Sequence, residues 1–171
     1  MTDLQSHPKS LAASIKQLAS GKGKENKRFF QSLRTIKGNE LDAAFHQAHE
    51  EVFAHTNCLE CANCCHGTGP LFLQKDIERL AKHFRIRPGQ FVEKYLREDE
   101  EGDMVLKATP CPFLATDNRC TVYEVRPKAC REFPHTDRRN MGEILELTRK
   151  NIAVCPAVYE IVERIKVSLK K

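Results

Sequence analysis

The sequence predicts a mainly α-helical protein with a small β hairpin, folded as an irregular, metal-stapled single domain with an N-terminal helical arm. Apolar residues recur at helical spacing over most of the chain, and glycines and prolines divide it into short elements. All eight cysteines follow residue 57. A chain of 171 residues suffices for one core. We therefore expect residues 1–57 to form the arm and residues 58–171 the cysteine domain.

The arm is predicted to hold three helices. Apolar residues recur every three or four positions over 11–18 and again over 29–36, with glycines between the two stretches. Asn39 has a side chain suited to capping a third helix, whose apolar face continues to His55.

The middle of the chain alternates helices with turn signals. Apolar spacing predicts a helix over 77–84, and Pro88 is placed to begin the next one. A strand is expected at Met104–Lys107, after an acidic loop. Residues 116–119 resemble a turn that joins CPFL to CTVY, so we expect the small antiparallel pairing there.

Two further helices are expected toward the C-terminus. A short one begins at Pro127, because proline is favoured at the start of a helix. A longer one carries an apolar stripe over 158–169.

Four cysteines form a C-x2-C-x2-C-C run, Cys58, Cys61, Cys64 and Cys65. Four thiols within eight residues indicate ligation of a soft metal ion or cluster, and successive two-residue gaps are more typical of iron-sulfur sites than of structural zinc sites. On a continuous helix Cys58, Cys61 and Cys65 would share one arc and Cys64 would lie to the side. One of the adjacent pair would then serve a second centre or bridge two metals, and spacing leaves the partition open.

The other four cysteines are scattered, each beside a turn or helix-end signal: Cys111, Cys120, Cys130 and Cys155. A centre that joins them to the run would close long loops and contribute folding free energy. Ordinary buried thiols are the alternative for any one of these four. We predict all eight cysteines as metal ligands.

Composition bears on location and partners. The start of the chain lacks an apolar signal segment and no later stretch is suited to crossing a bilayer, so we expect a cytoplasmic protein with reduced thiols and no membrane contact. Residues 1–38 carry eight Lys/Arg against two Asp/Glu. Aromatic residues are not clustered beside these charges, so a solvated helix pair is expected rather than a nucleic-acid surface.

Together, CLECANCC, CPFL, C-x-V-Y-E-x-R-P-x-x-C-R-E-F-P and a final cysteine resemble the CxxCxxCC family of zinc- or iron-chelating cysteine-cluster proteins. The resemblance spans residues 58 to about 156 and includes all eight cysteines. Some members are labelled iron-sulfur oxidoreductases, and a similar motif occurs in flagellin lysine N-methylases. The resemblance implies metal binding.

Charged residues near the cysteines have two interpretations. Arg126 and Arg131 could donate N–H groups to thiolate or cluster sulfur, or could pair with neighbouring glutamates. Asp76 and Glu78 show no carboxylate pairing suited to hydrolysis and are expected on solvated faces.

The sequence favours a metal-binding protein that holds an iron-sulfur cluster, with Zn²⁺ as the rival, for electron transfer or redox chemistry with an unidentified redox or protein partner. Glycine-rich phosphate loops and Ser/His/Asp spacing are absent from the sequence, and catalytic residues stay unknown. A cluster-dependent enzyme, either an oxidoreductase or methyltransferase-associated, and a zinc-stapled interaction module are the alternatives.

Overall fold

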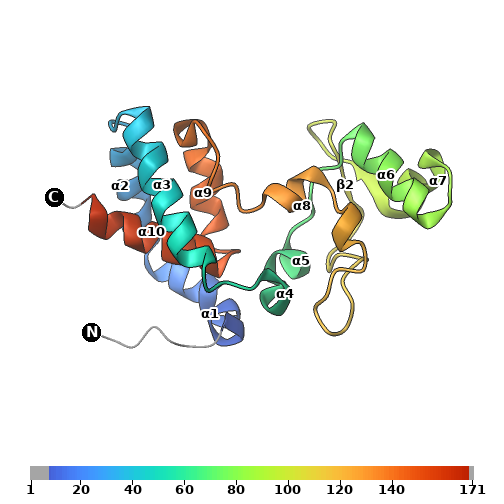
Figure 1. The fold of residues 1–171 in the computed structure, drawn as a ribbon, viewed down its shortest axis with the longest axis horizontal. Coiled ribbons are helices and arrows are strands. Elements are labelled where there is room, and N and C mark those ends of the chain that lie inside the picture. The colour runs from blue at the N-terminus through green and yellow to red at the C-terminus, as the bar shows by residue number, and fades with distance from the viewer. Residues whose placement is uncertain (1–7, 170–171) are drawn as a thin grey trace. The chain divides into compact units, whose positions relative to one another are not determined.

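The computed structural model describes residues 8–169, so residues 1–7 of the expected arm and residues 170–171 lie outside the described residues. The chain divides into two compact units (Figure 1), one with residues up to Cys61 and from Pro134 onward, the other Ala62–Phe133. Each unit has its own cluster of buried side chains, in place of the one core expected from composition. The prediction of mainly α structure with a small β hairpin is confirmed.

The first unit is helical. Its elements are α1 (Pro8–Gly21), α2 (Gly23–Leu33), α3 (Gly38–Phe53), α4 (Cys58–Cys61), the 3₁₀ helix η2 (Met141–Ile144), α9 (Leu145–Asn151) and α10 (Pro156–Ser168). Helix α10 packs against α1, α3 and α9, which lie around it in Figure 1. The helices predicted over 11–18 and 29–36 and toward the C-terminus are therefore present.

Apolar faces of these helices form the first core. Phe45 of α3 and Val158 and Ile161 of α10 are fully buried, as the predicted stripes require. The cap expected at Asn39 is wrong. The extended Lys37 precedes α3, and its carbonyl already accepts a hydrogen bond from the Leu41 N–H at 2.9 Å, so Asn39 lies within the first helical turn.

A buried ammonium joins α2 to α10. The Lys166 Nζ donates to Glu25 Oε1 at 2.6 Å, to Asn26 Oδ1 at 2.6 Å and to Glu163 Oε1 at 2.7 Å. All three N–H donors of the lysine are thus used, which offsets the cost of removing the charge from water.

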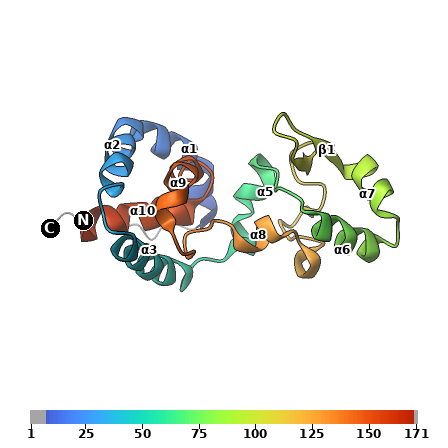
Figure 2. The ribbon, with the colours of Figure 1, turned by 90° about the horizontal axis from the view of Figure 1, so that it is seen from above.

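The second unit combines short helices with the hairpin. Its elements are α5 (Asn63–Gly67), α6 (Gln74–Phe84), α7 (Pro88–Tyr95), β1 (Leu96–Glu98), β2 (Met104–Leu106), the 3₁₀ helix η1 (Tyr123–Val125) and α8 (Lys128–Glu132). Helix α7 contacts both α6 and β1 (Figure 2). Pro88 begins α7 and Pro127 precedes α8, as predicted.

The hairpin lies earlier in the chain than expected. Strands β1 and β2 pair antiparallel around the acidic loop, with Leu96 opposite Leu106. The predicted turn between CPFL and CTVY does form, but it carries only the single bridge between Leu114 and Cys120. Leu96 and Leu106 are both buried in the second core, so apolar packing fixes the pairing of these two strands.

Aromatic rings fill the second core. Phe91 and Phe113 stack with ring centroids 6.1 Å apart, and Phe84 stacks on Phe113 at 5.6 Å. Phe113 comes from the loop that carries two of the scattered cysteines, so the core anchors that loop.

The division of the chain into an arm of residues 1–57 and a cysteine domain of residues 58–171 stays a prediction.

Among the described helices, none is both long enough and apolar enough to cross a membrane.

The surroundings of His49 in the first unit shift its pKa. Its ring stacks on Phe53 at 4.3 Å, and Nδ1 lies 2.8 Å from the hydroxyl of the buried Thr136. Burial lowers the pKa of His49 and outweighs the attraction of Asp137, whose carboxylate lies 3.9 Å from Nε2. The unfolded chain therefore binds more protons near the ordinary histidine pKa, and stability decreases as the pH falls from about 6.5 toward the lower folded-state value.

We expect His49→Gln to flatten this dependence, because glutamine can still bond Thr136 but does not titrate. Melting temperatures between about pH 7.5 and about pH 5.5 should fall less in this variant than in the wild-type protein. The exposed His83 supplies the control, and His83→Gln should keep the wild-type slope. Equal slopes for the wild-type protein and His49→Gln would contradict the assignment.

Candidate metal centres

The C-x2-C-x2-C-C run is two short helical turns. Asn57 opens α4, since its Oδ1 accepts a hydrogen bond from the Leu59 N–H at 3.1 Å. Ala62 then adopts the left-handed conformation with φ of 47°, and α5 begins at Asn63. The run is therefore not one continuous helix, and the single arc for Cys58, Cys61 and Cys65 does not form.

Cys64 and Cys65 both lie on α5 in the second unit. Their Sγ atoms are 4.0 Å apart. The contact with Cys64 lowers the pKa of Cys65 to about 7, against the opposing effect of burial. His66 also contributes to this lowering of the Cys65 pKa.

Backbone hydrogen bonds bring the next cysteine loop to α5. The Cys111 N–H donates to the Cys65 carbonyl at 2.8 Å. The same loop returns through the Leu114–Cys120 bridge, and the Thr121 N–H donates to the Phe113 carbonyl at 2.8 Å. Cys111 and Cys120 are both partly buried against the second core.

Four thiols of the second unit affect one another electrostatically; we call Cys65, Cys111, Cys120 and Cys130 the thiol quartet. The pKa of Cys111 is raised to about 11 and that of Cys130 to about 12, chiefly by burial and also by the charge of Cys65. Burial and Cys65 also raise the pKa of Cys120. The quartet comes from α5, from the 111–120 loop and from α8.

Backbone N–H donors and one guanidinium act on the sulfurs of the quartet. The N–H groups of Phe113 and Leu114 act on Cys111 and that of Val122 on Cys120, and each lowers the pKa of its thiol. The Arg126 guanidinium lowers the pKa of Cys120 and Cys130. Such donors stabilise thiolate or cluster sulfur, so the donor set suits an anionic sulfur-ligated metal.

Three cysteines of the first unit form a second group, which we call the thiol trio: Cys58, Cys61 and Cys155. The pKa of Cys155 is raised to about 12, chiefly by burial and also by charges on Cys58 and Cys61. Cys155 stands immediately before α10, and the Ala157 and Val158 N–H groups lower its pKa, although its sulfur makes no capping hydrogen bond of normal geometry. Helix α4, which carries the other two thiols, packs on α1.

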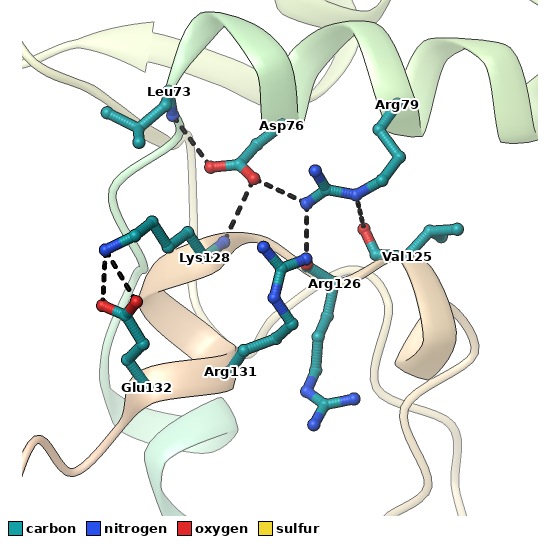
Figure 3. A network of polar contacts seen from close by, with 8 residues as sticks. All are labelled: Leu73, Asp76, Arg79, Val125, Arg126, Lys128, Arg131 and Glu132. Atoms are coloured by element: carbon teal, nitrogen blue, oxygen red, sulfur yellow. Dashed lines mark hydrogen bonds and ion pairs between the residues drawn. The ribbon is translucent and has the colours of Figure 1, made fainter. Parts of the chain in front are cut away.

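A polar network holds α8, the helix of Cys130 (Figure 3). Asp76 is buried, so its expected place on a solvated face is wrong, whereas Glu78 is exposed as expected. The Asp76 carboxylate accepts a hydrogen bond from the Lys128 N–H at 3.1 Å and pairs with Arg79 at 2.5 Å. Lys128 is 52 residues away along the chain, so helical periodicity alone gave no signal of this contact.

Arg126 and Arg131 bond to backbone carbonyls. Arg126 lies over the Tyr123 ring at 3.7 Å and donates to the Tyr123 carbonyl at 2.6 Å. Arg131 donates to the Arg126 carbonyl at 3.0 Å. Of the two, Arg126 carries the electrostatic influence on the thiols that the sequence suggested.

The described residues contain no three histidine, cysteine or carboxylate side chains already set in the arrangement that holds a metal ion. We therefore group the thiols of each unit by the effects of their charges on one another's pKa and by the backbone hydrogen bonds around them.

Residues 57–156 match the CxxCxxCC family model, described as a "Putative zinc- or iron-chelating domain". The chain belongs to the CxxCxxCC family. The matched residues contain the whole thiol quartet and the whole thiol trio, together with Cys64. Membership of the CxxCxxCC family therefore supports metal binding, with zinc or iron as the metal.

An uncharacterized protein of Methanocaldococcus jannaschii is 26% identical over 91 residues, which are 52% of this chain. The match spans 49% of that relative, about half its length. No solved structure matches the chain.

All eight cysteines lie within the described residues and are present as thiols. We expect eight thiols per chain to react with an alkylating reagent in denaturant and chelator, without prior reduction. Intact-mass measurement on freshly isolated protein counts them, and a fully reduced sample is the control. Native disulfides in the fresh sample would contradict reduced, metal-ligating cysteines.

Proposed function

We propose that the protein is a cytoplasmic metal-binding protein in which all eight cysteines are ligands, and that the thiol quartet forms one four-cysteine centre. The thiol trio contributes to a separate centre in the first unit. Cys64 is also a ligand, and it lies beside Cys65 in the second unit.

The observation that carries this proposal is the mutual influence of the four quartet thiols. They come from three stretches of chain, yet Cys65, Cys111 and Cys120 each raise the pKa of Cys130. Like-charged groups gathered at the edge of an apolar core are costly to ionise unless a cation compensates them. A bound metal supplies that compensation, and the backbone N–H groups near sulfur supply the rest.

An iron-sulfur cluster is our preferred occupant, with electron transfer or redox chemistry as the role. The thiol groups contain only sulfur ligands, and the N–H groups and Arg126 are suited to cluster sulfur as well as to thiolate. Zinc also accepts four thiolates, and a zinc-stapled interaction module is the second candidate. A cluster-dependent enzyme would add chemistry at the same centre.

Serine substitutions test the partition into two centres. We expect Cys120→Ser to lose the metal of the quartet and keep that of the trio, and Cys155→Ser to do the reverse. Each loss should destabilise its own unit by several kcal/mol, because metal binding in small sites is also folding free energy. Metal analysis and thermal unfolding of the full chain measure both effects.

The adjacent pair supplies the matched comparison. Cys65→Ser should remove the metal of the quartet, whereas Cys64→Ser should leave it bound. Loss of all metal from either Cys120→Ser or Cys155→Ser would refute two separate centres, and full metal content in both would refute the cysteine ligands.

Anaerobic preparation tests the metal. Protein made with iron and kept from oxygen should be coloured, contain acid-labile sulfide and bleach on reduction, because an iron-sulfur cluster changes oxidation state and Zn²⁺ does not. Protein made with zinc alone is the colourless control. Stoichiometric zinc without sulfide after anaerobic reconstitution would refute the iron-sulfur assignment and favour the zinc-stapled interaction module.

A further inference from the structure

We propose that Asp76 and Arg79 of α6 are positioning residues for the metal centre of the thiol quartet, because they fix the start of α8 and so the place of Cys130. The inference rests on the proposed function.

Helix α8 cannot be placed by its own apolar packing. It is five residues long, and although Pro127 just before it is buried, none of its own residues is fully buried. A metal ligand on such a helix needs another restraint, because small displacements of a ligand weaken a metal site. The polar network of Figure 3 provides that restraint.

Asp76 joins the starts of two helices through one carboxylate. Its Oδ2 accepts a hydrogen bond from the Leu73 N–H at 3.1 Å, where α6 begins, and Oδ1 accepts one from the Lys128 N–H at 3.1 Å, where α8 begins. The Asp76 side chain is only 3% exposed. Lys128 is two residues before Cys130, so the bond acts directly on the turn that carries the ligand.

Arg79 fixes the segment just before this turn. Its Nε donates to the Val125 carbonyl at 3.1 Å and its Nη2 to the Arg126 carbonyl at 2.8 Å. The same Nη2 pairs with Asp76 at 2.5 Å. The two residues thus hold three backbone groups in the stretch between Cys120 and Cys130.

This arrangement is directional, unlike apolar packing. A largely buried ion pair is costly to desolvate, and well-packed apolar residues often give equal or greater stability. Fixed hydrogen bonds instead define where backbone atoms stand. The Lys128–Glu132 pair on the outer side of α8 is exposed and adds little restraint.

Cobalt titration of the full chain tests this role, because sulfur-to-cobalt charge-transfer absorption reports thiolate ligation. Cys155→Ser is the parent, so that the trio contributes less signal. Asp76→Asn and Arg79→Lys should each weaken Co²⁺ binding about 10- to 100-fold, as loss of groups that orient ligands typically does. Glu78→Gln, on the same helix, and Arg97→Lys, on β1, change exposed residues in the same ways and should leave the affinity unchanged.

Unfolding of the metal-free variants separates positioning from stability. Lower stability without a change in Co²⁺ affinity would overturn the inference. If Asp76→Asn does not fold, Arg79→Lys decides, because it keeps the charge and loses the forked pair of bonds.

Cys130→Ser separates failure of this inference from failure of the proposed function. If Cys130→Ser weakens Co²⁺ binding and the Asp76 and Arg79 variants bind like their parent, only the positioning role is wrong. If Cys130→Ser itself binds like the parent, the proposed four-cysteine centre is wrong.

Discussion

Burial raises the pKa of three thiols in the quartet, Cys111, Cys120 and Cys130, and the nearby charge of Cys65 also raises the pKa of each. Bringing such groups together at the edge of a core opposes their ionisation. Nearby hydrogen-bond donors and a positive charge offset part of this cost. Backbone N–H groups near Cys111 and Cys120 and the Arg126 guanidinium all favour thiolate. Much of the second unit can be understood as the framework that brings these donors to these sulfurs.

Different forces hold the parts of that framework. Phe113 is packed among the rings of the second core, so the loop that bears Cys111 and Cys120 is fixed by apolar burial. Helix α8 has no fully buried residue of its own, and Asp76 and Arg79 form hydrogen bonds to the backbone at and just before its start. The first unit likewise combines an apolar core with the buried Lys166 ammonium between α2 and α10. In both units, buried polar side chains thus add directed hydrogen bonds to the apolar packing of the core.

Local signals explain what could be predicted from the sequence. Pro88 and Pro127 mark helix starts through their fixed φ, and the stripe over 158–169 marks a buried face through its periodicity. The burial of Asp76 was missed because its partner on α8 is distant in the sequence. Spacing also could not group the cysteines, because that grouping depends on how α5, α8 and the 111–120 loop pack. Their role as ligands stays a prediction.

The left-handed Ala62 changes what the cysteine run means as a motif. Written as C-x2-C-x2-C-C it looks like one binding loop of eight residues, but the backbone reverses its handedness after the second cysteine. It is better regarded as two short helical turns in tandem, with Cys58 and Cys61 in the first unit and Cys64 and Cys65 in the second. If the proposed centres form, a synthetic peptide of residues 57–67 would therefore be a poor mimic of either one, because the other cysteines of each thiol group come from distant parts of the chain.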